Sequence, residues 1–313
     1  METLPDFITR IRTDQLNSEW LTSRHVEAAI LRLDLMDYGL SGNKWFKLRE
    51  NLRMARSSGK SAILTFGGPY SNHLLACAAA CRHFGFDSIG LVRGRYPADT
   101  PSLEQAACLG MVLHRLDKAS YARKAEAEFL QQWQQRYPEA WMVPEGGANS
   151  YGVEGCRSIL DWAAPQQYTH ICCSLGTGTT MAGLLNHPCR AIRIGFPAMR
   201  RGNYLLQELQ PYLQHPENLS KLVLMEEYHF GGFARKTPEL TAFMNCFFHS
   251  YGIGLDFVYT GKMAYGVFDM IERGFFPKGS RILMIHTGGM QGNRSLRQGT
   301  LCYGADPADN ADH

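Results

Sequence analysis

A lysine stands at the expected start of a helix, in the segment Ser41-Gly-Asn-Lys-Trp-Phe-Lys-Leu-Arg. The positive end of the helix dipole disfavours an ammonium group there, and burial beside Trp45 and Phe46 would disfavour it again. Both effects favour the neutral form of the Lys44 amine, which is the nucleophile that captures a carbonyl group. A solvated lysine that points outward is the simpler interpretation of this segment taken alone. The other polar loops decide between the two interpretations.

Four glycine-rich stretches each follow a predicted strand. They are Phe66-Gly-Gly-Pro-Tyr-Ser-Asn-His, Pro144-Glu-Gly-Gly-Ala-Asn, Ser174-Leu-Gly-Thr-Gly-Thr-Thr and His286-Thr-Gly-Gly. In open parallel sheets, ligands bind at the loops that follow the carboxyl ends of the strands. Any one of these stretches could be a plain turn. Four at such positions indicate a binding site.

The stretch that begins at Ser174 is the best candidate for binding a phosphate group. Its glycines let backbone N–H groups converge, its threonines add hydroxyl donors, and the following helix favours an anion at its N-terminus. Gly176 and Gly178 also have the G-x-G spacing of dinucleotide-binding loops. However, the stretch comes late for a first βαβ unit, no clear acidic ribose partner follows it, and it lacks the lysine of a P-loop. A tight turn between a strand and a helix is the alternative.

Two further segments place polar side chains at predicted helix starts. Ser71, Asn72 and His73 open an alanine-rich helix, whose backbone donors could hold a carboxylate or a phenolate oxygen. Ser71 could equally be only a helix cap, and a lone histidine is more often structural than catalytic. The segment Val258-Tyr-Thr-Gly-Lys supplies a phenol and a hydroxyl before another helix. Its Tyr259 could equally be a core tyrosine with its hydroxyl satisfied.

Short apolar runs alternate with helix-length amphipathic segments along the chain. This alternation predicts an α/β fold with open parallel sheets that helices cover on both faces. One helix is predicted from Trp45 to just before Gly59, and another from the cap Ser71 to near Gly85. The predicted strands are 29–35, 62–66, 88–92, 111–116, 141–143, 170–173, 192–195, 221–224 and 282–285.

The composition is that of a globular protein rather than a disordered chain. The 313 residues are 45% hydrophobic and 19% charged, and 32 basic against 29 acidic residues give a net charge of +3. We therefore expect no nucleic-acid partner, and the apolar runs are too short to span a membrane. The N-terminal segment does not have the pattern of a signal peptide. Nine scattered cysteines without a CxxC pair favour free thiols in a reducing cytoplasm and no metal site.

The polar segments, in their order along the chain, resemble the 1-aminocyclopropane-1-carboxylate deaminase and D-cysteine desulfhydrase family. Its members are pyridoxal-phosphate enzymes with the fold of the tryptophan synthase β subunit. The matching pieces are Ser41-Gly-Asn-Lys-Trp-Phe-Lys-Leu, Tyr70-Ser-Asn-His, Pro144-Glu-Gly-Gly-Ala-Asn-Ser-Tyr-Gly, Ser174-Leu-Gly-Thr-Gly-Thr-Thr-Met-Ala-Gly-Leu, Val258-Tyr-Thr-Gly-Lys and Ile285-His-Thr-Gly-Gly. Each piece is weak alone, whereas the ordered set covers nearly the whole chain and is specific.

We expect two α/β domains with the cofactor between them. The smaller domain is predicted at residues 50–155, and the larger, cofactor-binding domain combines residues 1–49 and 156–313. The resemblance also implies a homodimer.

The resemblance implies roles for the residues in the first matching pieces. Lys44 would bind pyridoxal 5'-phosphate covalently and act in catalysis, with Lys47 as the competing lysine. Ser71 follows Lys44 at the distance that the family pattern requires. Asn72 would flank the ring oxygen of the cofactor, and Ser71, Asn72 and His73 would bind the substrate carboxylate. Ser71 is also expected among the catalytic residues.

The later pieces would supply the phosphate and ring contacts. Tyr259 matches the family tyrosine that faces the substrate and acts in catalysis. Thr260 lies where desulfhydrase-like members carry threonine and deaminase members carry a glutamate near the pyridine nitrogen. A neutral threonine there would leave the pyridine ring less cationic, which suits β-elimination. The residues implied to hold the phosphate are Thr177, Gly178, Thr179 and Thr180.

Two positions depart from the family pattern. In Tyr228-His-Phe-Gly-Gly-Phe-Ala, Phe233 occupies the place of a second active-site tyrosine and cannot donate a hydrogen bond. This change disfavours the opening of a cyclopropane ring, which uses both tyrosines in this family. Ser41 stands where the family usually has glycine, and because serine also caps helices well, this change is expected to matter little.

The leading hypothesis is a pyridoxal-phosphate-dependent lyase of a small amino acid. Like D-cysteine desulfhydrase, it would carry out β-elimination to pyruvate, ammonia and sulfide. The second hypothesis is deamination of 1-aminocyclopropane-1-carboxylate to 2-oxobutanoate and ammonia, which Phe233 and Thr260 disfavour. From other classes, a nicotinamide-dependent oxidoreductase would use the Gly176 loop for a pyrophosphate. A cofactor-binding protein without catalytic activity would keep the loops and show no turnover.

Overall fold

The chain forms two compact units in the computed structural model, which describes residues 6–36, 39–94, 99–199 and 202–304. The larger unit combines Met1–Asn43 with Cys156–His313, and the smaller unit is Lys44–Gly155. The chain thus passes into the smaller unit between Asn43 and Lys44. The domain boundary predicted at residue 50 lies further along, within helix α2 (Asn43–Ser57).

A six-stranded sheet forms the core of the larger unit, with the strand order β1-β2-β10-β7-β8-β9. Its strands are β1 (Thr13–Gln15), β2 (Glu27–Arg32), β7 (His170–Leu175), β8 (Ile192–Pro197), β9 (Leu222–Leu224) and β10 (Arg281–His286). Every neighbouring pair is parallel except β1 and β2. The prediction of parallel sheets is therefore confirmed for all strands but β1. Strand β1 is absent from the predicted strands because Thr-Asp-Gln contains no apolar run.

The strand predicted at 29–35 differs at both ends from the observed β2. The ladder begins at Glu27 and stops at Arg32, and Leu33–Leu35 forms the short 3₁₀ helix η2 instead. The carbonyl of Leu33 accepts the N–H of Gly42 at 2.8 Å rather than a ladder bond. Leu31, Leu33 and Leu35 alternate with polar residues as in a strand, but Leu33 is buried in the 3₁₀ turn and Leu35 is only partly buried there.

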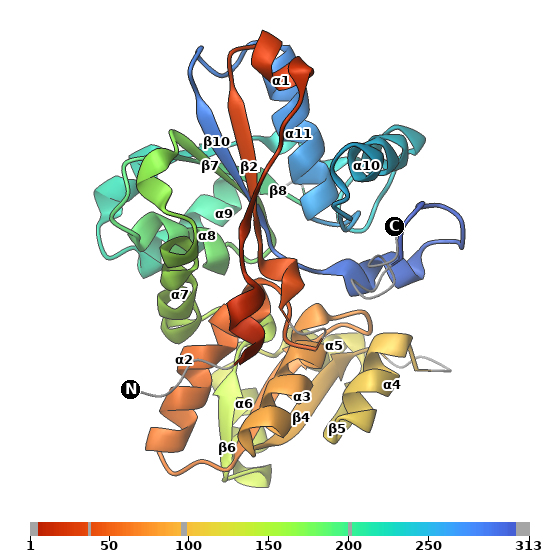
Figure 1. The fold of residues 1–313 in the computed structure, drawn as a ribbon. Helices are drawn as coiled ribbons and strands as arrows, with labels where there is room; N and C mark the ends of the chain where they lie inside the picture. The colour runs from red at the N-terminus through yellow and green to blue at the C-terminus, as the bar shows by residue number, and fades with distance from the viewer. Residues whose placement is uncertain (1–5, 37–38, 95–98, 200–201, 305–313) are drawn as a thin grey trace. The chain divides into compact units, whose positions relative to one another are not determined.

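Helices cover both faces of the larger sheet (Figure 1). Helix α11 packs on β7, β8 and β10 through apolar residues three and four positions apart, such as Met263, Val267 and Met270. The helices of this unit are α1 (Glu19–Ser23), α8 (Thr179–Asn186), α9 (Gly202–Leu209), α10 (Pro238–Tyr251) and α11 (Thr260–Glu272), and α7 (Ser150–Arg157) leads into it.

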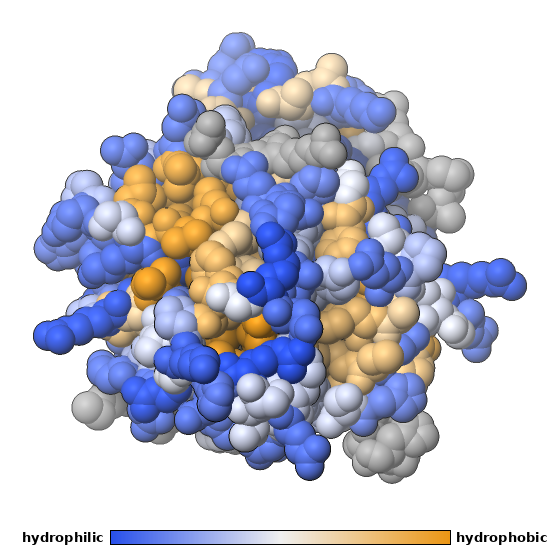
Figure 2. All heavy atoms as spheres, turned by 90° about the horizontal axis from the view of Figure 1, so that it is seen from above, coloured by the Kyte–Doolittle hydropathy of each residue, from blue (hydrophilic) through white to orange (hydrophobic). Residues whose placement is uncertain are grey.

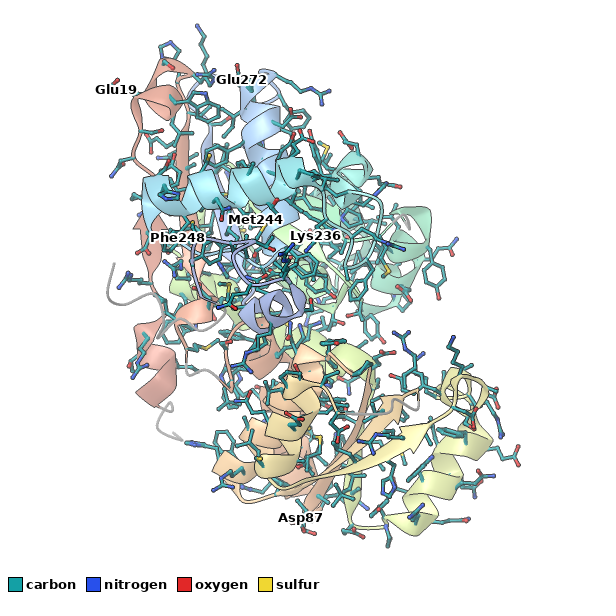
Figure 3. The ribbon with its side chains drawn as sticks, turned by 90° about the vertical axis from the view of Figure 1, so that its right-hand side faces the viewer. Glu19, Asp87, Lys236, Met244, Phe248 and Glu272 are labelled. Atoms are coloured by element: carbon teal, nitrogen blue, oxygen red, sulfur yellow. The ribbon has the colours of Figure 1, made fainter. Side chains whose placement is uncertain are left out.

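Helix α1 and the end of α11 meet at the end of the larger unit where the strands β2 and β10 begin. Trp20 stacks on Phe268 with ring centroids 5.2 Å apart, and Arg24 forms an ion pair with Glu272. Figure 3 shows Glu19 and Glu272 at this same end. Seen from this side, apolar patches lie between hydrophilic side chains (Figure 2). The glycine-rich loops of this unit, after β7 and β10, follow the opposite, carboxyl ends of its strands.

A four-stranded parallel sheet with the order β5-β4-β3-β6 forms the smaller unit. Its strands are β3 (Ala62–Gly67), β4 (Asp87–Arg93), β5 (Met111–Leu116) and β6 (Ala140–Val143). Besides α2, its helices are α3 (Asn72–Phe84), α4 (Pro101–Cys108), α5 (Lys118–Ala122) and α6 (Ala127–Arg136). Helix α3 matches the prediction: Ser71 caps its start, and Gly85 ends it with a left-handed φ of 70°.

The central strand β3 is buried on both faces. Ala62, Leu64 and Phe66 pack with aromatic side chains of α5 and α6, whereas Thr65 faces His73 of α3. Alternate residues of a strand point to opposite faces, so one apolar run serves both helix layers.

Short 3₁₀ helices connect many of these elements, and no helix of the described residues is long and apolar enough to cross a membrane. The 3₁₀ helices are η1 (Asp6–Arg10), η2 (Leu33–Leu35), η3 (Glu145–Gly147), η4 (Ser158–Trp162), η5 (Pro165–Gln167), η6 (Gln210–Tyr212), η7 (Pro216–Lys221), η8 (Glu226–His229) and η9 (Met290–Ser295).

Candidate active site

The loop between β7 and α8 has the conformation of an anion-binding site. Gly178 precedes the first residue of α8 with a left-handed φ of 75°, which glycine adopts at little cost. The hydroxyl oxygens of Thr177 and Thr179 lie 2.9 Å apart at the same turn. The first N–H groups of an α-helix lack partners within the helix, and hydroxyls beside them add donors. The predicted phosphate-binding residues therefore lie together at one helix N-terminus.

Asn43, the residue before Lys44, is bonded to this loop. Its Nδ2 donates to the hydroxyl oxygen of Thr180 at 2.7 Å, and both side chains are buried. Its N–H also donates to the carbonyl oxygen of Thr287 at 3.2 Å. Gly42 packs so closely on Thr287 that an added Cβ would lie 2.0 Å from the same oxygen. The glycine-rich loop after β10 thus holds the segment 42–43 against α8, and the chain continues from there into Lys44.

Buried ionisable side chains lie next to the loop after β10. His286 is fully buried, with Nε2 at 2.8 Å from the carbonyl oxygen of Gly254 and Nδ1 at 3.4 Å from the Asp34 carboxylate. Arg32 pairs with Asp34 at 2.7 Å. Burial would raise the pKa of Asp34, but the neighbouring His286 and Arg32 outweigh it and hold this pKa below its usual value.

A buried aspartate that the sequence analysis missed organises the start of α11. The carboxylate of Asp256 accepts the N–H groups of Val258, Tyr259 and Thr260 at 3.0, 2.8 and 2.8 Å, and the Thr260 hydroxyl at 2.5 Å. The Thr260 oxygen in turn accepts the N–H of Asp256 at 2.9 Å. Because its single proton is directed to Asp256, Thr260 Oγ1 can only accept a hydrogen bond from any further partner.

The ring of Tyr259 lies against the β7–α8 loop. An added Cβ at Gly176 would stand 3.3 Å from Cε1 and 3.4 Å from the hydroxyl oxygen of Tyr259, so a larger residue would displace the phenol. On another side, the ring of Phe233 meets Tyr259 edge to face with centroids 6.0 Å apart. Phe233 is 50% exposed. Tyr259 and the predicted phosphate loop are therefore neighbours, and Phe233 borders them.

Lys262 anchors the segment that carries Phe233. Its ammonium donates to the carbonyl oxygens of His229 and Gly232 at 2.9 and 2.7 Å. Only 2% of the residue is exposed, and burial lowers the pKa of Lys262 to about 8. This lysine joins α11 to the 229–232 segment one turn after Tyr259.

In the smaller unit, Lys44 lies in the first turn of α2, where the sequence analysis predicts it. Trp45 and Phe46 are buried beside it, and Lys44 itself is half-buried. The competing lysine, Lys47, is buried as well. An added Cβ at Gly147, whose φ is 70°, would lie 2.9 Å from Lys47 Cβ. The glycine of η3 thus leaves room for the stem of Lys47.

The three polar residues at the start of α3 differ in their surroundings. Ser71 Oγ accepts the N–H of Leu74 at 3.3 Å and so caps the helix. The Oδ1 atom of Asn72 is buried and has no hydrogen-bond partner in the described part of the chain. Such an atom is costly unless a ligand satisfies it.

His73 is 3% exposed rather than solvated. Its Nε2 lies 2.9 Å from the Thr65 hydroxyl, and its Nδ1 finds no partner among the residues that the structure describes. Burial, together with the positive charges of Lys44 and Lys47, lowers the pKa of His73 well below its usual value.

Asp256, Thr65 and Lys262 are not among the residues predicted for the site. Only one of them has a recognisable signal in the sequence. An aspartate four residues before Thr260, at a helix start, is a capping signal, and Asp256 could have been found from it. Thr65 sits in an apolar strand, where threonine is common for its β-propensity alone. Nothing in the spacing distinguishes Lys262 from a surface lysine.

The chain is similar in sequence to several known proteins, although no protein-family model matches it. It is 28% identical over 278 residues to a putative 1-aminocyclopropane-1-carboxylate deaminase of Pyrococcus horikoshii, which covers 84% of each chain. It is 28% identical over 294 residues to the mitochondrial bifunctional D-cysteine desulfhydrase/1-aminocyclopropane-1-carboxylate deaminase of Arabidopsis thaliana, which covers 85% of this chain and 73% of the relative.

A solved structure, described as an ACC deaminase homologue, superposes with a TM-score of 0.75 at 27% identity and covers 91% of this chain and 90% of that one. The resemblance that the ordered motifs indicate is thus confirmed. By sequence and by fold, this chain is a homologue of the 1-aminocyclopropane-1-carboxylate deaminase and D-cysteine desulfhydrase family of enzymes.

Proposed function

We propose that this protein is a pyridoxal-phosphate-dependent lyase of a small amino acid, with a D-cysteine-like β-elimination as its main reaction. The observation that carries the proposal is the bond between Asn43 and Thr180. This bond holds Asn43, the residue before Lys44, against the β7–α8 loop, which has the conformation of an anion-binding site. A cofactor with a phosphate group and an aldehyde needs both an anion loop and a lysine.

The residues present fit this cofactor. Thr177, Thr179 and Thr180 supply hydroxyls around the left-handed Gly178, and Lys44 supplies the amine for the aldehyde. Asn72 offers a buried amide atom that lacks a partner in the described part of the chain. Thr260 is assigned to the ring nitrogen, toward which its oxygen can act as an acceptor.

Bound pyridoxal phosphate supplies an electron sink for the pair left when a bond at the substrate α-carbon breaks. The chain supplies the rest. The N–H groups at the start of α3, with Ser71, bind the substrate carboxylate. The Lys44 amine moves the proton at the α-carbon. Tyr259, held against Gly176, directs its phenol toward the substrate.

Phe233 supports elimination over ring opening, because it has no hydroxyl for a second proton transfer. Thr260 does not separate the two reactions, since its oxygen only accepts and the ring nitrogen would have to carry a proton to bond with it. Deamination of 1-aminocyclopropane-1-carboxylate is the second candidate, and the names of the relatives favour it. A nicotinamide-dependent oxidoreductase is a weaker candidate, since none of the relatives cited above is named as one.

The test is a panel of D- and L-amino acids, with 1-aminocyclopropane-1-carboxylate, offered to the protein purified with pyridoxal phosphate. We expect pyruvate and sulfide from D-cysteine, and slower or no release of 2-oxobutanoate. Violet-region absorbance of the lysine-bound cofactor should disappear in Lys44→Ala. A protein that binds a nicotinamide nucleotide tightly, shows no such absorbance and releases no keto acid would contradict the proposal.

A further inference from the structure

A chain of hydrogen bonds beneath helix α3 fixes the protonation of His73. The hydroxyl of Thr65 lies 2.8 Å from the carbonyl oxygen of Val143 and 2.9 Å from His73 Nε2. Thr65 and Val143 face each other across the parallel strands β3 and β6. All three residues belong to the smaller unit.

The direction of each bond follows from what the groups can donate. A carbonyl oxygen only accepts, so the single proton of the Thr65 hydroxyl goes to Val143. The Thr65 oxygen is then the acceptor toward His73, and the proton of that bond belongs to Nε2. A neutral imidazole with its proton on Nε2 has a lone pair on Nδ1.

That lone pair is buried and unpaired within the described part of the chain. An acceptor in such a place calls for a donor. It would repel a carboxylate, because both atoms would present lone pairs to each other. The charged groups that act on His73 are the amines of Lys44 and Lys47 on α2. Ammonium groups donate and never accept.

We propose that Thr65 is a positioning residue that holds His73 as its Nε2–H tautomer, so that Nδ1 accepts an N–H from the Lys44 amine. The role of His73 then differs from the expectation that its ring binds the substrate carboxylate. In this tautomer the ring orients the Lys44 amine, and the substrate carboxylate binds to Ser71 and the backbone N–H groups of α3. The consequence for catalysis rests on the proposed function, whereas the tautomer does not.

The surroundings keep this arrangement stable. A second proton on the ring would sit on Nδ1, in a buried position and beside two positive side chains. Both conditions disfavour the imidazolium and agree with the lowered pKa of His73. The ring is therefore neutral over the physiological range, and its Nδ1 remains an acceptor.

The direct test is ¹⁵N NMR of histidine side chains in the protein without cofactor, with the His73 signals assigned by their loss in His73→Gln. From about pH 6 to about pH 8, we expect a pyridine-type Nδ1 and a pyrrole-type Nε2. Thr65→Ser keeps the hydroxyl and should keep this pattern, whereas Thr65→Val should mix the tautomers. A pyrrole-type Nδ1 or an imidazolium in the wild-type protein would overturn the proposal, as would an unchanged pattern in Thr65→Val.

The partner of Nδ1 is tested by lysine variants in the same experiment. Lys44→Ala should shift the Nδ1 resonance of His73, and Lys47→Met should shift it less. The reverse order would contradict the assignment to Lys44. If the wild-type protein shows the expected tautomer but never binds the cofactor, the proposed function fails while the tautomer stands.

Steady-state kinetics distinguish two roles of His73, namely orienting the Lys44 amine and binding the substrate carboxylate. Thr65→Val should lower kcat by about tenfold with little change in KM, because the substrate contacts are kept. A large rise in KM at unchanged kcat would show that the ring binds the carboxylate and would overturn the proposal. Thr169→Val is the matched control: the Thr169 hydroxyl lies 2.8 Å from His170 Nδ1 in the larger unit, in a pair without an assigned role. It should leave kcat and KM unchanged.

Discussion

The side-chain amide of Asn43 donates to the hydroxyl of Thr180 across 137 positions of sequence, at 2.7 Å. Asn43 directly precedes the candidate cofactor lysine, Lys44. Thr180 lies in the first turn of α8, where the candidate phosphate site is. The two halves of the proposed chemistry are thus linked by one hydrogen bond and one peptide bond.

Loss of this bond should weaken cofactor binding. Asn43→Ala should raise the Kd for pyridoxal phosphate about tenfold, or about 1.4 kcal/mol, since the variant removes one buried hydrogen bond and leaves Thr180 with one partner fewer. Asn43→Asp should be worse, because it adds a negative charge beside the phosphate loop. Absorbance titration measures both. Asn218→Ala is the control: it removes a comparable amide bond, to Leu185 at the other end of α8, and should leave the Kd unchanged.

The pKa of Lys262 predicts a specific dependence of stability on pH. Its pKa falls from an ordinary 10.5 to about 8 on folding, so the unfolded chain binds more protons between these values. The free energy of unfolding should therefore rise with pH from about 8 to about 10.5, by up to about 3 kcal/mol from this group. Below about pH 8 this gain is lost. Urea denaturation of the wild type and Lys262→Met over this pH range measures the contribution of the lysine. If the free energy of unfolding rose equally steeply with pH in both proteins, the assignment to Lys262 would be refuted.

The capping role of Asp256 predicts a large loss of stability on a small change. In Asp256→Asn, an NH₂ group would meet the N–H and hydroxyl donors of Thr260, or of Val258 and Tyr259 if the amide is reversed. We expect a loss of about 2–4 kcal/mol, together with a lower kcat through misplacement of Tyr259. Asp117 caps α5 through the N–H of Ser120 at an exposed position, and Asp117→Asn should cost less than about 1 kcal/mol. Similar losses for the two variants would contradict the capping account.

Phe233 should decide between the two lyase reactions. Phe233→Tyr places a hydroxyl beside the Tyr259 ring and should raise the release of 2-oxobutanoate from 1-aminocyclopropane-1-carboxylate about tenfold or more, because general acid–base groups contribute at least that much. Stability should change little, since Phe233 is half exposed. Phe275 is also an exposed phenylalanine, and Phe275→Tyr should have no effect on either reaction. An unchanged ring-opening rate in Phe233→Tyr would exclude this residue as the determinant of specificity.

The fold was predictable wherever local signals agreed with burial. Helix α3 has a serine cap, an apolar repeat and a terminal glycine, and the structure places its ends as predicted. Strand β1 has none of these signals, because its three polar residues pair only at a sheet edge.

The candidate site was predictable as a set of loops but not as a network. The order of motifs predicts Lys44 and the residues 177–180 as cofactor contacts, and these roles stay predictions. The sequence does not show that Asn43 reaches Thr180 or that Thr65 supports His73, because such pairs form only when distant segments pack. Asp256 lies between these cases, since a capping carboxylate acts within four residues.

Lys44 is the lysine that we propose to hold the cofactor. Borohydride reduction of the protein with bound pyridoxal phosphate fixes the cofactor permanently to that lysine, and peptide mass spectrometry then locates it. We expect the added mass on Lys44. Modification of Lys47 instead, or no modified lysine after reduction, would contradict it.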